Sequence, residues 1–84
     1  MPHEALEPKL SFGQKAVGIR FNHARGETYN EVDTAKENCA LLIDQMNDLR
    51  NNSESSEQKR LASIAITELQ SAQMWAVKAI TWQD

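Results

Sequence analysis

The chain has 84 residues, 40% of them hydrophobic and 25% charged, with a formal net charge of −3 at pH 7. This length is enough for one domain with a small core. Three Gly and two Pro leave little turn chemistry for a β-sheet, and the single Cys excludes an intrachain disulfide framework and suits a reducing cytosol. A mostly acidic surface repels long polyanions, so binding to DNA is not expected.

The N-terminal residues 1–9 are expected to form a flexible tail. Pro2 and Pro8 cannot donate backbone hydrogen bonds, and few apolar residues accompany them. We expect residues 10–84 to form a single helical hairpin domain. No signal peptide or membrane-spanning segment is recognisable, which indicates a soluble, cytoplasmic protein that does not bind membranes.

A short helix is predicted after this tail. Ser11 is a plausible N-cap, and the apolar residues that follow it predict a helix to about Arg20. Residues 21–28 are predicted to form a loop, because Asn22 and Gly26 favour turns.

The clearest helix is predicted at Tyr29–Leu49. Apolar residues recur there at spacings of three and four and form a seam along one helix face: Val32, Ala35, Cys39, Leu42, Met46 and Leu49. Thr28 followed by Glu31 matches a capping box at its start. The polar stretch Asn51–Ser56 then predicts the break that closes a helical hairpin.

The last helix is predicted from a cap at Ser55 or Ser56 to about Thr81. Its second half is apolar nearly all round: Leu69, Ala72, Ala76 and Ile80 share one face, and Met74, Trp75, Val77 and Trp82 lie on the others. The chain is too small to bury this surface alone, so the pattern indicates a subunit interface. The predicted fold is all-α: an antiparallel two-helix hairpin with a short N-terminal helix laid across one end, assembling into a symmetric oligomer.

Signatures of enzymes and metal sites are not recognisable in the sequence. It contains no Gly-rich phosphate loop, paired cysteines or nucleophile elbow. His3 and His23 are expected to be surface residues, and Cys39 a small core residue. We therefore expect no catalytic residue, no metal and no cofactor.

The charges are unevenly distributed along the chain. Residues 9–25 contain four basic residues and no acid, whereas residues 26–57 contain eight acids and two bases. A small, compact anion could be held where the basic segment folds against Lys36 or Lys78.

The basic segment also contains groups that suit a nucleotide. Phe21 can stack on a base, Asn22 can read a base edge, and Arg20 or Arg25 can pair with a phosphate. The alternative interpretation is that Phe21 packs the loop on the hairpin and that Asn22 only forms a turn.

Three residues on the long helices extend this interpretation. Trp75 and Lys78 share a helix face and would supply a flat wall and a charge beside an anion. The alternative places Trp75 in an interface and Lys78 in solvent. Lys36 could point toward the basic segment, or it could be an ordinary surface lysine.

Three pieces of the sequence together resemble a known family. They are Ser11–Gly18 (SFGQKAVG) leading to Phe21-Asn22, the helix from Val32 through Lys36 to Leu49, and Thr67–Ala79 (TELQSAQMWAVKA) with its specific block MWAVKA. Their order resembles the phage hairpin family that contains the anti-CBASS and anti-Thoeris sponge proteins. The resemblance implies symmetric oligomers, often hexamers, that sequester nucleotide second messengers of bacterial immunity without cleaving them.

The resemblance also implies ligands and site residues. In that family cyclic dinucleotides, cyclic trinucleotides or cyclic ADP-ribose isomers lie in pockets between protomers. Phe21 stands where the family places a base-stacking aromatic, and Asn22 completes the family's Phe-Asn pair. Lys36 matches a basic position on the first long helix, and Lys78 matches the basic position of the final block.

The resulting hypothesis is a non-enzymatic binder of cyclic nucleotide immune signals in the cytoplasm of an infected bacterium. The alternative is a helical interaction protein that docks a host protein through Trp75 and Trp82.

Overall fold

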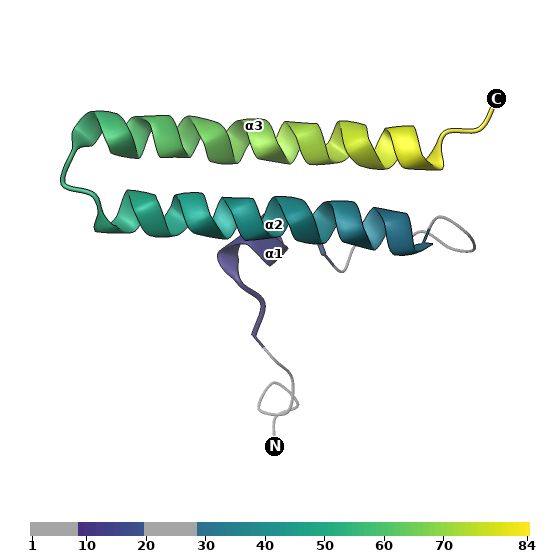
Figure 1. Cartoon of the computed structure of the whole chain (residues 1–84), viewed down its shortest axis with the longest axis horizontal. Helices are drawn as coiled ribbons and strands as arrows, with labels where there is room; N and C mark the ends of the chain where they lie inside the picture. The colour runs from purple at the N-terminus through teal and green to yellow at the C-terminus, as the bar shows by residue number, and fades with distance from the viewer. Residues whose placement is uncertain (1–8, 20–28) are drawn as a thin grey trace, which may run out of the picture.

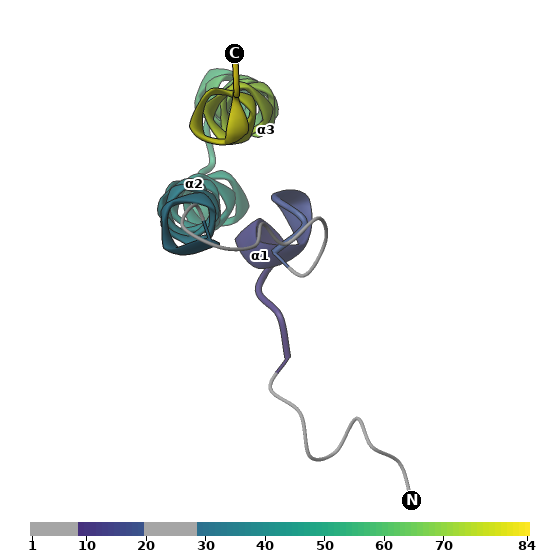
Figure 2. The ribbon, with the colours of Figure 1, turned by 90° about the vertical axis from the view of Figure 1, so that its right-hand side faces the viewer.

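The computed structural model describes residues 9–19 and 29–84. In these two ranges the chain forms three helices and no strand, which are α1 (Phe12–Ala16), α2 (Tyr29–Asn52) and α3 (Ser56–Thr81). α2 and α3 run antiparallel and side by side, and α1 packs against one side of α2 (Figures 1 and 2). The all-helical prediction is confirmed for the described residues.

The connection between α2 and α3 is shorter than predicted. Only residues 53–55 are non-helical, so the expected break at Asn51–Ser56 is wrong for Asn51 and Asn52, which belong to α2. The last turn of α2 is held by Arg50, whose guanidinium donates to Ser63 Oγ of α3 at 3.1 Å. This tertiary bond explains why the helix continues past Leu49.

The ends of α3 agree with the sequence. Ser55 is the N-cap, with extended backbone, and its Oγ accepts a hydrogen bond from the Gln58 backbone N–H at 3.1 Å. The helix ends at Thr81, as predicted.

α1 begins as predicted but is shorter. Ser11 Oγ accepts from the Gln14 backbone N–H at 3.0 Å, and the Ser11 N–H donates to Gln14 Oε1 at 2.8 Å, which completes a capping box. The helix ends at Ala16 rather than near Arg20, because Gly18 adopts a left-handed conformation with φ of 61°. The predicted loop at 21–28 and the cap residue Thr28 lie outside the described residues.

The docking of α1 differs from the expected crossing at one end of the hairpin. α1 lies against the middle of α2, where the Gly13 backbone N–H donates to Asp44 Oδ1 at 2.6 Å. At the other end of α1, Gln70 Nε2 of α3 donates to the carbonyl oxygen of Ala16 at 3.3 Å. α1 is therefore held by both long helices.

The core lies where these three helices meet. Its buried apolar residues are Val17, Val32, Ala40, Ile43, Ala62 and Ile66. The predicted seam of α2 is only partly correct, because Leu42 and Leu49 are 42% and 38% exposed. α2 contacts α1 as well as α3, and this second contact rotates its buried face toward Ala40 and Ile43.

Candidate functional site

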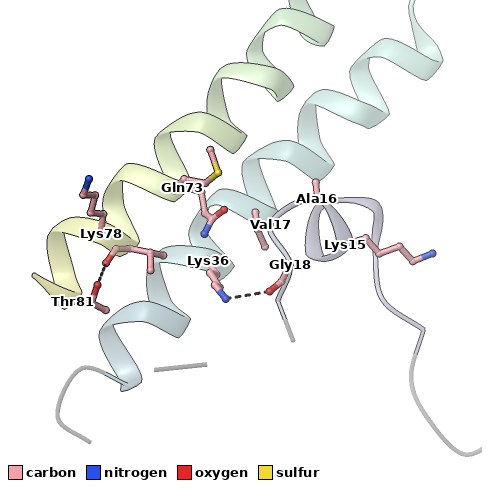
Figure 3. A pocket seen from close by; sticks show the side chains of 10 residues that line it. Lys15, Ala16, Val17, Gly18, Lys36, Gln73, Lys78 and Thr81 are labelled. Atoms are coloured by element: carbon pink, nitrogen blue, oxygen red, sulfur yellow. Dashed lines mark hydrogen bonds between the residues drawn. The ribbon is translucent and has the colours of Figure 1, made fainter. Parts of the chain in front are cut away.

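A groove lies between the C-terminal end of α1, the first half of α2 and the second half of α3 (Figure 3). Its volume is about 590 Å³, within the range of small-molecule sites. Ten residues from all three elements and from the turn after α1 line it: Lys15, Ala16, Val17, Gly18, Lys36, Gln73, Met74, Val77, Lys78 and Thr81.

Lys36 is buried in the wall of this groove. It is 3% exposed, and its Nζ donates to the carbonyl oxygen of Gly18 at 3.2 Å (Figure 3). Because the side chain is buried and bonded to the turn at residues 17–19, the interpretation as an ordinary surface lysine is wrong. The side chain instead ties the turn after α1 to α2.

Lys78 lines the rim of the groove beside an exposed aromatic ring. Its Nζ lies 5.4 Å from the centroid of the Trp75 ring, a cation–π contact between residues one helical turn apart. Trp75 is 67% exposed and does not line the groove. The pair therefore forms a platform at the edge of the groove and not part of its floor.

The lining of the groove is basic although the chain is acidic. Lys15, Lys36 and Lys78 contribute three positive charges, and no Asp or Glu is among the lining residues in the described part of the chain. Val17, Val77 and Met74 add apolar surface between the charges. A basic, partly apolar groove suits a compact anion with flat, apolar parts.

Four of the residues singled out by the sequence, Arg20, Phe21, Asn22 and Arg25, lie outside the described residues. The structure brings Lys36 and Lys78 to one groove and places Trp75 beside it.

Sequence reasoning missed Lys15, Gln73 and Thr81 as groove residues. Gln73 gave a usable signal, because it lies seven residues after Ile66 and eleven after Ala62, both buried, and so occupies a core position of α3. Lys15 gave only a charge, and its place at the groove depends on how α1 docks.

Other kinds of site find no support in the described ranges. No group of three or more His, Cys, Asp or Glu side chains there is arranged to hold a metal ion. None of the helices found there has the length and apolar character needed to cross a membrane.

The family model for the Acb2/Tad1 hairpin domain matches residues 14–81. The match spans α2, α3 and most of α1, and the chain therefore belongs to this anti-CBASS and anti-Thoeris sponge family. No curated protein and no solved structure gives a significant match to the chain.

Proposed function

We propose that this member of the Acb2/Tad1 hairpin family sequesters cyclic nucleotide second messengers and so blocks bacterial anti-phage defence without cleaving the signal. Cyclic dinucleotides, cyclic trinucleotides and cyclic ADP-ribose isomers are the candidate ligands. The observation that carries the proposal is the groove with three lysines on a hairpin of this family.

Phosphates of the ligand would meet the lysine side chains. Lys78 and Lys15 are exposed at the groove and can turn toward a phosphate. Lys36 contributes its charge from the wall, where burial strengthens its electrostatic effect.

The residues that follow Gly18 would complete the site. We propose that Phe21 stacks on a base, that Asn22 reads a base edge, and that Arg20 and Arg25 pair with phosphates. Supporting this is the position of Gly18 in the groove wall, only two residues before Arg20.

A symmetric homo-oligomer, a hexamer as the family resemblance implies, would close the groove with a neighbouring protomer. The groove is open in one chain, whereas tight capture requires a ligand to be largely enclosed. Large exposed apolar side chains on both long helices supply the surface for such assembly.

Isothermal titration of the purified protein tests the proposal. The ligands are 3′,3′-linked and 2′,3′-linked cyclic dinucleotides, cyclic triadenylate and a cyclic ADP-ribose isomer. Submicromolar binding, with intact ligand recovered after heat denaturation, is expected. A linear product would indicate hydrolysis, and no binding by any ligand would overturn the proposal.

Lys78→Met is expected to weaken binding of whichever of these ligands the wild type binds by roughly 10-fold, which is the scale of one charge-assisted contact to a phosphate. Lys59→Met is the matched control, because Lys59 is an exposed lysine of the same helix that does not line the groove. Equal affinities of the two variants in the titration would remove Lys78 from the site.

A second candidate function is docking of a host protein by the exposed tryptophans at the end of the hairpin. Trp75 and Trp82 are 67% and 64% exposed, and tryptophans often anchor protein interfaces. A pulldown in which one stoichiometric host protein is retained, without nucleotide, and is lost in Trp75→Ala would favour this function over sequestration.

A further inference from the structure

Gln73 is a buried polar residue in the groove wall that the sequestration mechanism above does not use. It is 7% exposed, on the same side of α3 as the core residues Ala62 and Ile66. Figure 3 shows its side chain extending from α3 into the space next to Lys36 and Val17. The carboxamide therefore faces whatever occupies the groove.

The Gln73 carboxamide makes no hydrogen bond to any residue that the structure describes. A neighbouring glutamine provides the contrast: Gln70 Nε2 donates to the carbonyl oxygen of Ala16 at 3.3 Å and so ties α1 to α3. The amide atoms of Gln73 are not among the enclosed, unpartnered side-chain atoms of the described residues, so they reach solvent in the groove. The amide is therefore available to a ligand, and it holds no described part of the fold together.

We propose that Gln73 reads the polar edge of a purine base of the captured ligand, at the 6-position. A carboxamide presents an N–H donor next to a C=O acceptor in one plane. Adenine presents the complementary pair at N6 with N7 or N1, and guanine presents it at N1 and O6. This inference rests on the proposed function and adds to it the source of base selectivity.

The other described residues that line the groove are less suited than Gln73 to distinguish one base from another. The three lysines act as point charges that attract phosphate and do not distinguish bases. Val17 and Val77 offer apolar contact, which every base face accepts. Thr81 also lines the groove, but its hydroxyl already donates to the carbonyl oxygen of Val77 at 2.9 Å.

The test changes the protein and the ligand together. The probes are 3′,3′-linked cyclic diadenylate and cyclic triadenylate, each paired with an analogue in which hydrogen replaces the 6-amino group of every base. The variant is Gln73→Met, which keeps the length of the side chain and removes its hydrogen bonds. Affinities of both proteins for the parent probes and for the analogues are measured by titration.

The wild type is expected to bind at least one parent probe roughly 10- to 100-fold more tightly than its analogue, the range of a good bidentate base contact. Gln73→Met is expected to lose affinity for the parent by a similar factor and to bind parent and analogue alike. This loss of coupling identifies a direct contact, because a general change in the groove would weaken both ligands equally.

A stability measurement separates recognition from folding. Without ligand, Gln73→Met is expected to melt at or above the temperature of the wild type, because no hydrogen bond among the described residues is lost. Gln70→Met is the matched control: it should lower the melting temperature and keep the preference for the parent probe. Gln73→Met that keeps the preference would overturn this inference alone, whereas a wild type that binds no panel ligand would overturn the proposed function as well.

Discussion

Gly13 is the residue that allows α1 to lie against the backbone of α2. A Cβ at this position would collide with the Ala40 carbonyl oxygen and would lie 2.8 Å from the Ala40 carbonyl carbon and 2.9 Å from Asp44 Oδ1. Backbone atoms cannot move aside as a flexible side chain can. The Gly13 N–H also donates to Asp44 Oδ1 at 2.6 Å. A side chain at position 13 that pushed α1 away from α2 would therefore break this hydrogen bond together with the contact to the Ala40 backbone.

Gly13→Ala is therefore expected to destabilise the protein by about 1–3 kcal/mol, the usual cost of forcing atoms into a packed contact. Urea denaturation at a fixed protein concentration measures the free energy of unfolding. Lys15→Ala is the control, because Lys15 is an exposed residue of the same short helix. If both variants were equally stable, α1 would not be docked through Gly13.

Cys39 gives a pH-dependent prediction. Burial raises the pKa of the Cys39 thiol above its ordinary value of 9.0, because the half-buried site disfavours the thiolate. The thiol of the unfolded chain therefore ionises first as the pH rises. Its contribution to stability is complete below the unfolded pKa and is lost as the pH rises through the folded pKa.

The stability advantage of the wild type over Cys39→Ala should accordingly shrink as the pH rises past about 9 and stay constant between about pH 6 and 7. Urea denaturation of the two proteins at a series of pH values checks this. Alkylation at pH 8 should also be slower for the folded protein than for the chain in urea. A folded thiol that reacts as fast as the unfolded one would show that Cys39 is not shielded.

At the scale of the helices, the N-cap of α3 can be separated from its sequence neighbour. Ser55 Oγ accepts from the Gln58 N–H, whereas Ser56 lies in the first turn, and both residues are exposed. Ser55→Ala should cost about 1 kcal/mol of stability, and Ser56→Ala only a few tenths, because only Ser55 satisfies a free backbone donor. Thermal or urea denaturation of the two variants measures these losses of stability. Equal losses would show that Ser55 is not the N-cap.

The helix boundaries show which parts of this fold local sequence determines. The start of α1 at Ser11 and the span of α3 to Thr81 follow from capping residues and periodicity, which act within a few residues. The end of α2 depends on the Arg50–Ser63 bond between two helices, and the position of α1 depends on Gly13 and Asp44. Contacts between distant residues are not encoded in the local pattern, so these features could not be predicted.

The groove likewise combines residues that the sequence identifies with a geometry that depends on tertiary contacts. Lys36 and Lys78 were found from charge and from the family resemblance, because charge can be read directly from the letters. That Lys36 is buried, and that Lys15 joins it, follows from the docking of α1 against the middle of α2. Helix periodicity identifies a buried face only when one neighbour covers the helix, and α2 has two.

At the scale of the whole molecule, one side of the hairpin is left without a cover by the described residues. α1 docks on one side of the hairpin (Figure 2). Ala40 and Gln70 lie next to α1, and Leu49 and Leu61 lie nine residues from Ala40 and Gln70, respectively. At 100° per residue, both leucines therefore point away from that side. Leu42 shares this direction on α2. Leu42, Leu49 and Leu61 are 42%, 38% and 52% exposed, respectively. We call the surface that these three leucines form the bare face of the hairpin.

We predict that the bare face mediates one of the contacts of self-association, because it combines exposed leucines from both long helices. Leu61→Glu should raise the dissociation constant of the assembly by at least roughly 10-fold, since each copy would bury a charge in place of a leucine. Light scattering over a dilution series measures the mass, and circular dichroism should show unchanged helix content.

Leu41→Glu is the matched control, because Leu41 is 68% exposed but lies about 100° around α2 from Leu42. Dissociation by Leu41→Glu and not by Leu61→Glu would place the interface on the outer face of α2, and a monomer for the wild type would contradict a binding site shared between protomers.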